Sequence, residues 1–320
     1  MKIPPWLGFT LSILLIAAMI FGTVSQIDWT TVITLLEDIT PMAMVMGVVI
    51  MWGNFLVATV RFQSILKISL SHVPAFSTLF SLNLLSSFAA HLAPVGPAAD
   101  VARFGYARWK LKLPTKPLVE TIIMDRVIAL LGLALVGLCL LPIQWRLGVD
   151  VKLLVPQLAL WLACLLGMTG GHFLGCKLLQ PHWGKITILV NSFLNIFGTL
   201  LNHRHGLAQQ IILAIAYSGS FSLLMWVFAQ GMNIEGDLLF FIAFGPLVLL
   251  AQSIPIFYAG WGGREFTAVA TMGSIGVITA SQAVSISVAI GVTFFIASLP
   301  GAAIQLYGKK NNDLESPDNN

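Results

Sequence analysis

Most of the chain consists of long apolar runs that carry no charged side chain. A helix needs about 20 apolar residues, at ~1.5 Å of rise each, to cross the hydrocarbon core of a bilayer. Six stretches have a length suited to one crossing. Five are charge-free, 3–27, 39–60, 153–176, 207–233 and 280–306, and the sixth, 118–145, has a charge-free core at 127–145. The pattern therefore predicts an all-α, polytopic membrane protein with about six full spans.

Two further apolar stretches are interrupted by residues that break helices. The first, 74–112, contains Pro94, Gly96 and Pro97, and the second, 239–278, contains Pro255 and a run of glycines after it. Irregular backbone at membrane depth is tolerated only where it is buried in protein or lines a cavity. Each stretch is therefore predicted to enter the membrane as a helix, break, and continue as a half-helix.

The charges of the loops predict how the spans are oriented. Both flanks of 74–112 are basic, with Lys67 before it and Arg108, Lys110 and Lys112 after it. The positive-inside rule places both flanks in the cytoplasm, so this segment is predicted to be re-entrant. The second broken segment follows an acidic loop at Glu235 and enters from outside. We expect a multi-pass protein of the cell (inner) membrane with both termini cytoplasmic, although loop 146–152, predicted outside, carries bases.

These assignments divide the chain into two similar halves. Residues 1–150 and 151–308 each comprise two spans, a re-entrant hairpin and a span, in opposite orientation. Such an inverted repeat with broken helices is typical of transporters whose site lies near the midplane. We predict one transmembrane domain, 1–308, and a disordered polar tail, 309–320. The short piece 186–203 is interpreted as an interfacial or loop helix.

Composition supports a membrane protein and excludes several classes. Only 9% of residues are charged and the mean hydropathy is +0.89, whereas soluble domains carry about 25% charged residues. The net charge of +4 fits basic loops beside anionic lipid, and no nucleic-acid partner is expected. The three cysteines show no C-x-x-C spacing, and no phosphate-loop motif occurs. No metal or cofactor is expected.

Charged residues at the two breaks are the first candidates for a site. Asp100 and Arg103 follow the first break, and Arg264 and Glu265 follow the second. A guanidinium near the start of a half-helix suits a phosphate group, because free N–H groups and the helix dipole add to its charge. The alternative is that each arginine and its neighbouring acid form a pair that merely neutralises buried charge. Because ionised side chains are costly within the membrane, their presence there favours the functional interpretation.

Three further charged or titratable positions complete the candidate set. Asp125 and Arg126 are adjacent and so point to different faces of a helix, which requires partners elsewhere; Asp100 and Arg103 are candidates. Alternatively, the two residues snorkel to the interface. His91 could titrate or bind a headgroup, or serve as a hydrogen-bonded structural residue. Arg61 and Glu120 are expected to be interfacial.

These motifs resemble the flippase-like family named for the lysylphosphatidylglycerol synthase transmembrane domain. The resemblance covers nearly the whole chain and rests on the motifs Pro94-x-Gly96, Asp100-x-x-Arg103, Asp125–Arg126 and Gly260-x-Gly262-x-Arg264–Glu265, together with Arg61. The family's usual acid in the second of these motifs is Glu. The resemblance implies translocation of lipids or lipid-linked sugars. It does not imply the synthase activity of relatives fused to an aminoacyl-transfer domain.

The leading hypothesis is therefore a non-enzymatic lipid translocase. A membrane lipid or polyprenyl-linked substrate would bind with its phosphate near Arg103 and Arg264, while its tails stay in the bilayer. The main alternative is a non-transporting scaffold for a membrane glycosyltransferase or lipid synthase. A membrane enzyme that uses Asp or Glu on a lipid phosphate ranks last.

Overall fold

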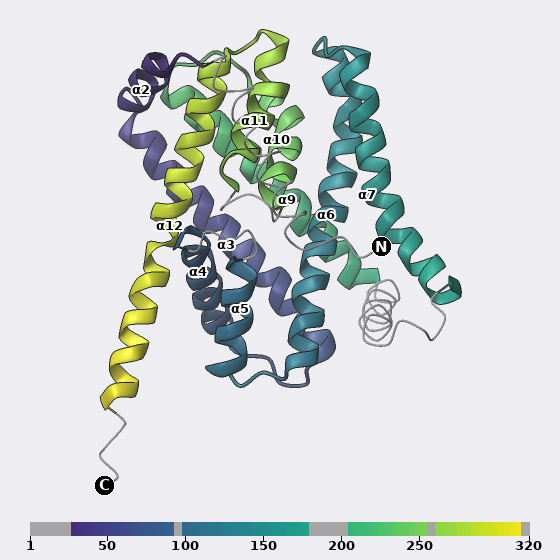
Figure 1. Cartoon of the computed structure of the whole chain (residues 1–320), viewed down its shortest axis with the longest axis vertical. Helices are drawn as coiled ribbons and strands as arrows, with labels where there is room; N and C mark the ends of the chain where they lie inside the picture. The colour runs from purple at the N-terminus through teal and green to yellow at the C-terminus, as the bar shows by residue number, and fades with distance from the viewer. Residues whose placement is uncertain (1–26, 93–97, 179–203, 255–259, 315–320) are drawn as a thin grey trace, which may run out of the picture.

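The computed structural model describes residues 27–92, 98–178, 204–254 and 260–314, and this part of the chain is helical throughout (Figure 1). This confirms the predicted all-α class. The helices are α2 (Trp29–Glu37), α3 (Pro41–Ser69), α4 (Phe76–Leu92), α5 (Ala98–Trp109), α6 (Thr115–Arg146), α7 (Val151–Leu178), α9 (Arg204–Gly231), α10 (Leu238–Ser253), α11 (Gly263–Thr271) and α12 (Ala280–Leu314), with a 3-10 turn, η3, at Gly273–Ile275.

Within the described ranges, four helices are long and apolar enough to cross a membrane. They are α3, α6, the segment Ala208–Gly231 of α9 and the segment Ala280–Ala303 of α12. Shorter apolar helices are α4, α10 and the segment Val151–Leu166 of α7. Four of the six predicted spans are thus confirmed as helices of sufficient length. The first predicted span, 3–27, and the piece 186–203 lie outside the described residues.

Two helices extend beyond the spans that hydropathy predicts. The second span was expected to end at Val60, but α3 continues to Ser69, so Arg61 lies about two turns inside the helix. The last helix, α12, runs to Leu314 and includes the first residues of the predicted polar tail. Both breaks, at 93–97 and 255–259, lie outside the described residues.

The helices pack in two sets that correspond to each other. α3 packs along α9, α4 against α5, and α10 against α11. α3 also contacts α4, α6 and α12, and α9 likewise contacts α10, α12 and α6. Finally, α4 packs on α12 and α10 packs on α6. Exchanging α3, α4, α5 and α6 for α9, α10, α11 and α12 maps the α3–α9 contact onto itself and each of the other contacts onto another of them.

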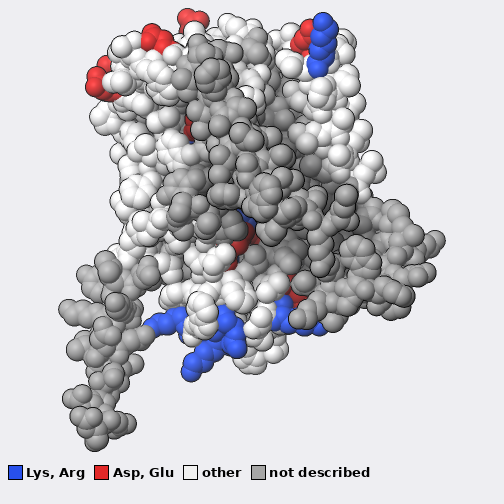
Figure 2. All heavy atoms as spheres, viewed as in Figure 1, with Lys and Arg blue, Asp and Glu red and all other residues white. Residues whose placement is uncertain are grey.

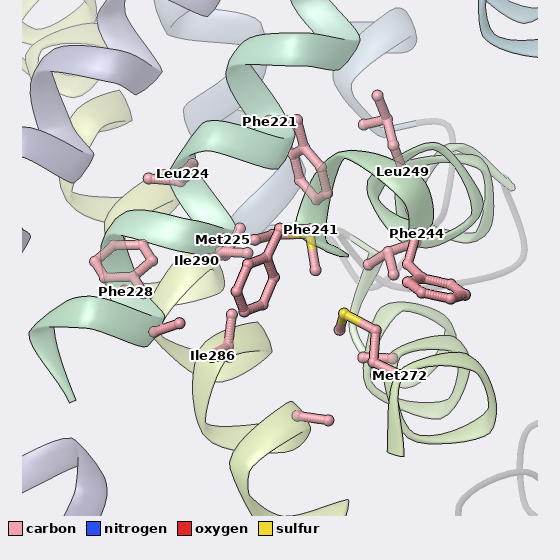
Figure 3. Packing of buried hydrophobic residues seen from close by; sticks show 14 of the residues in the cluster. Phe221, Leu224, Met225, Phe228, Phe241, Phe244, Leu249, Met272, Ile286 and Ile290 are labelled. Atoms are coloured by element: carbon pink, nitrogen blue, oxygen red, sulfur yellow. The ribbon is translucent and has the colours of Figure 1, made fainter. Parts of the chain in front are cut away.

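The largest apolar core lies where α9, α10 and α12 meet (Figure 3). Aromatic side chains of α9 and α10, including Phe228 and Phe241, pack with Ile286 and Ile290 of α12. Small residues allow the backbones to approach: a Cβ on Gly47 of α3 would lie 2.6 Å from the ring of Phe228. Close approach through small residues is the usual way that helices associate in membranes, where the hydrophobic effect between helices is weak.

The surface charge is divided between the two ends of the molecule. In Figure 2, Lys and Arg gather at the end where α5 passes into α6, and most exposed acids lie at the opposite end, around α2. The exposed bases Arg146 and Lys152, where α6 passes into α7, also lie at this opposite end. The exposed bases at the first end are Lys67, Arg108, Lys110, Lys112 and Lys116. The exposed acids at the other end include Asp28, Glu37, Asp38, Glu235 and Asp237. The apolar helices run between these two ends.

Candidate functional site

Five charged side chains from three helices form one cluster. Arg61 comes from α3, Asp100 and Arg103 come from α5, and Asp125 and Arg126 come from α6. α5 begins at Ala98 and so places Asp100 in its first turn, where the helix dipole favours an acid. We call these five residues the arginine–aspartate cluster. Figure 2 shows acidic and basic atoms in a recess near the middle of the face.

Asp125 lies at the centre of the buried part of this cluster. Its Oδ1 accepts from Arg61 Nη2 at 2.9 Å, and its Oδ2 lies 3.5 Å from Arg103 Nη1. Arg61 Nη2 also donates to the Asp125 carbonyl at 2.7 Å, close to the helix axis of α6. The side chains of Arg61, Arg103 and Asp125 are only 5%, 11% and 14% exposed. The guanidinium of Arg103 further stacks 5.0 Å above the ring centre of Phe62.

Asp100 and Arg126 form the more exposed part of the cluster. Arg126 donates through Nε and Nη2 to the two carboxylate oxygens of Asp100, each at 3.0 Å, which is the bidentate fork geometry. Their side chains are 24% and 48% exposed. The prediction that Asp125 and Arg126 take partners from Asp100 and Arg103 is confirmed, and the pairing is crosswise. The alternative, in which Asp100 and Arg103 neutralise each other within α5, is wrong because each pairs with α6.

The cluster carries an excess of positive charge. Three guanidinium groups face two carboxylates, which leaves one positive charge unmatched among the described residues. The Nε atoms of Arg61 and Arg103 are also buried and make no hydrogen bond within the described part of the chain. A buried polar donor without a partner costs free energy, so the arrangement favours an additional acceptor.

A pocket adjoins the cluster and is mostly apolar. Its empty space, including the mouth, is about 460 Å³. It is lined by the polar side chains Arg61, Arg126, Tyr217 and Ser253 and by the apolar side chains Ala129, Leu130, Leu133, Ala214 and Leu249. The α6 residues at 126, 129, 130 and 133 form one stripe, charged at one end and apolar for the following two turns. The pocket therefore suits an amphiphile with an anionic group.

A second, smaller charged centre surrounds Arg264 at the start of α11. Arg264 is fully buried, and its Nη2 pairs with Glu265 Oε1 at 2.8 Å. Arg264 Nε donates to Ser287 Oγ on α12 at 2.8 Å, and the Ser287 hydroxyl donates to Glu265 Oε1 at 2.8 Å. Glu265 Oε2 accepts from the Gly262 N–H at 2.6 Å, and the guanidinium stacks on Trp261. This centre is electrically neutral and closely packed.

The structure separates the two arginines that follow the breaks. Arg103 contacts Asp125 and Phe62, whereas Arg264 contacts Glu265, Ser287 and Trp261, so each arginine belongs to its own centre. His91 is at the end of α4 and packs against aromatic residues. Its ring lies edge-on against Phe294 and Phe295 of α12, with ring centres 4.9 and 5.6 Å apart.

Three residues of the site escaped the sequence prediction. Arg61 was expected at the membrane interface, but its side chain is buried and pairs with Asp125. The apolar residues Phe62, Ile65 and Leu66 that follow it in the sequence, all of them buried, could have indicated that this part of α3 is covered by other helices. Tyr217 and Ser253 line the pocket from apolar helices without any distinguishing motif. Glu120, also expected at the interface, lies 3.9 Å from the exposed Lys116.

No curated protein matches this chain. A family model described as the lysylphosphatidylglycerol synthase TM region matches residues 6–301, which include all described residues of both charged centres and of the pocket. The match extends over most of the 320 residues, and the chain therefore belongs to the lysylphosphatidylglycerol synthase TM region family.

Proposed function

We propose that the chain is a membrane translocase that binds the phosphate of a lipid at the arginine–aspartate cluster. One observation carries the proposal: a buried cluster with three arginines and two aspartates opens onto a mostly apolar pocket. Arg61 and Arg126 line the pocket and would grip the phosphate, while Arg103 and both acids hold them in place.

The physical reason is the cost of an unmatched cation at membrane depth. An ionised side chain at the centre of a bilayer costs ~2.5–3.5 kcal/mol or more unless it is paired. A bound phosphate would supply the missing negative charge, and planar guanidinium groups bind phosphate oxygens through two donors. The apolar stripe beyond Arg126 would cover the part of the lipid next to the headgroup, and the tails would remain in the bilayer.

The proposed mechanism requires access from both leaflets. We propose that α4 and α5 form a re-entrant hairpin from the cytoplasm, because the bases at 67, 108, 110, 112 and 116 lie at one end of the molecule. By the same rule α10 and α11 enter from outside, and both termini are cytoplasmic. The matching helix contacts of the two sets support an inverted repeat, whose halves would rock against each other.

We place the phosphate at the arginine–aspartate cluster rather than at Arg264. Arg264 forms an ion pair with Glu265, and Ser287 is hydrogen-bonded to both side chains. This centre therefore has no net positive charge to attract a phosphate. We propose that the centre fixes the start of α11 onto α12 during rocking. The chain would thus bind and move a lipid without making or breaking covalent bonds.

The test uses the full chain reconstituted in liposomes with a fluorescent phospholipid, whose exposure is followed by a reductant that cannot cross the bilayer. Arg61→Lys and Arg126→Lys keep the charge but lose the planar fork, so each should slow translocation about tenfold or more. Arg108→Lys is the matched control, because Arg108 is an exposed residue of α5 outside the cluster. Circular dichroism and thermal unfolding would confirm folding of every variant.

The same assay separates the translocase from a scaffold for a lipid synthase or glycosyltransferase. If the protein is a scaffold, the positive charge at positions 61 and 126 is sufficient, and both lysine variants would still recruit a partner. Liposomes that contain the wild-type protein would then expose the fluorescent lipid no faster than protein-free liposomes. Wild-type rates in both lysine variants, at equal reconstitution, would refute the phosphate site.

A further inference from the structure

We infer that the pocket selects lipids whose phosphate carries a single negative charge, that is, phosphodiesters, over phosphomonoester and diphosphate lipids. The inference rests on the proposed function, because it concerns the same site. It follows from the number of charges in the cluster and from their surroundings.

The charge balance sets the preference. The cluster holds one positive charge in excess, so one negative charge on the ligand makes the site neutral. A phosphodiester carries one charge, whereas a phosphomonoester above pH ~6 approaches two and a diphosphate carries at least two. The second charge would leave the occupied site negative, in a region that disfavours net charge of either sign.

The position of the acids adds to this preference. Arg61 and Arg126, which line the pocket, are bound directly to Asp125 and Asp100 at 2.9 and 3.0 Å. A phosphate at these arginines therefore lies one guanidinium away from each carboxylate. Each carboxylate therefore offsets part of the attraction that a second phosphate charge would gain from the arginines. At a separation of ~6 Å and an effective dielectric constant of ~20, one such charge–charge interaction corresponds to about 100-fold in binding before screening and relaxation.

The described surroundings provide no other cation to offset a second charge. Arg264 is committed to Glu265, and Arg103 is bound to Asp125 and stacked on Phe62. Arg108, one to two turns beyond Arg103 on α5, is exposed at the basic end of the molecule. The remaining polar pocket residues, Tyr217 and Ser253, offer hydroxyl groups that can donate to one phosphate without changing the charge balance.

The test compares two lipids with the same acyl chains and different phosphate charge. Phosphatidylglycerol is the phosphodiester and phosphatidic acid is the phosphomonoester, and each competes with a fluorescent phosphatidylglycerol for the full-length protein in detergent micelles. At pH 8 phosphatidylglycerol should bind about tenfold or more tightly than phosphatidic acid. At pH 5.5, where the monoester regains its proton, the ratio should fall toward one.

A charge variant tests the same inference from the side of the protein. Asp100→Asn removes one negative charge from the more exposed pair and raises the excess to two, so the ratio at pH 8 should shift toward phosphatidic acid by about tenfold or more. Asp125→Asn should do the same in protein that remains folded. Glu120→Gln is the control, because it removes an acid from the same helix outside the cluster and should leave the ratio unchanged.

The outcomes distinguish this inference from the proposed function. If phosphatidic acid binds as tightly as phosphatidylglycerol at pH 8, or if folded Asp100→Asn keeps the wild-type ratio, charge selection is refuted while lipid binding stands. If neither lipid binds the wild type, the proposed function fails as well. The wild-type comparison at two pH values decides the question even if a variant does not fold.

Discussion

Removing the carboxylate of Asp125 should destabilise the protein far more than removing that of Asp100. Asp125 is the shared partner of Arg61 and Arg103, whose side chains are 5% and 11% exposed. Asp125→Ala therefore strands two buried guanidinium groups at once. Asp100→Ala strands only Arg126, whose side chain is 48% exposed and can turn toward water.

The magnitudes follow from burial. Breaking a buried pair from one side costs ~3–5 kcal/mol, because the remaining charge stays in a medium of low dielectric constant. An exposed or half-exposed pair contributes about 1 kcal/mol or less. For a chain of this size each kcal/mol corresponds to roughly 2 °C in Tm, so we expect a loss of about 6–10 °C for Asp125→Ala and about 2 °C or less for Asp100→Ala.

The assay is thermal unfolding of purified protein in one detergent, monitored by circular dichroism. Asp125→Asn is measured beside Asp125→Ala, because the amide retains the shape of the side chain and loses its charge. Both changes should lower the Tm to a similar extent if charge is the cause. Equal losses for the Asp100 and Asp125 variants, or a normal Tm for Asp125→Ala, would refute the central role of Asp125.

Three further results are expected. Single cysteines at Lys67 and Lys112, in a background without native cysteines, should be labelled from the same, cytoplasmic side; labelling from opposite sides would contradict the re-entrant hairpin. Gly301→Ala should destabilise the α4–α12 contact by about 1–3 kcal/mol, because its Cβ would lie 2.5 Å from the backbone of α4, whereas Gly219→Ala, with no atom within 4 Å, should be neutral or stabilising in the same unfolding assay. Hydrogen bonds from two threonine hydroxyls lower the pKa of Asp28 below its ordinary 3.8. Because the pKa of Asp28 is lower in the folded protein, its carboxylate contributes to the free energy of unfolding above pH 3.8, and this contribution is lost as the pH falls through the folded-state pKa. The unfolding midpoints of wild type and Asp28→Ala should therefore differ at pH 6 and converge in strong acid.

The spans and the helical class could be predicted because the bilayer imposes a simple rule. Backbone polar groups must be satisfied within the membrane, so an apolar run of sufficient length becomes a helix whatever its neighbours are. The helices α3, α6, α9 and α12 follow this rule. Their ends were predicted less well. α3 continues past Arg61, whose guanidinium is covered through its pairing with Asp125 of α6, and hydropathy contains no information about that cover.

The pairing of charges was predictable in part. Adjacent residues of a helix point about 100° apart, so Asp125 and Arg126 had to find different partners. Asp125 pairs with Arg61 and Arg103, and Arg126 pairs with Asp100. The prediction of an ion pair between Asp100 and Arg103 within α5 was wrong because Asp100 has a better partner on α6. Arg126 donates two parallel hydrogen bonds to the Asp100 carboxylate. Spacing along one helix indicates which side chains share a face. It cannot indicate whether a better partner faces them from another helix.

The pocket could not be predicted from sequence. Tyr217 lies in a continuous apolar stretch of α9, and Ser253 is the last residue of α10. Neither spacing nor charge distinguishes these hydroxyl groups from others that bond to their own helix, as Ser253 itself does to the Leu249 carbonyl at 2.8 Å. Their role depends on the crossing of four helices, and such crossings are determined by packing.

The two sets of helices match in packing and differ in charge, and this difference bears on mechanism. α5 binds α6 through ion pairs at Asp125 and Arg126, whereas the equivalent contact of α11 with α12 uses the neutral hydroxyl of Ser287. The excess charge therefore belongs to one half alone. If the halves rock, a phosphate bound by the arginines remains with α3, α5 and α6, and Tyr217 and Ser253 on α9 and α10 change their distance from it. Under the proposed mechanism the first half carries the lipid, and the second half opens and closes the path.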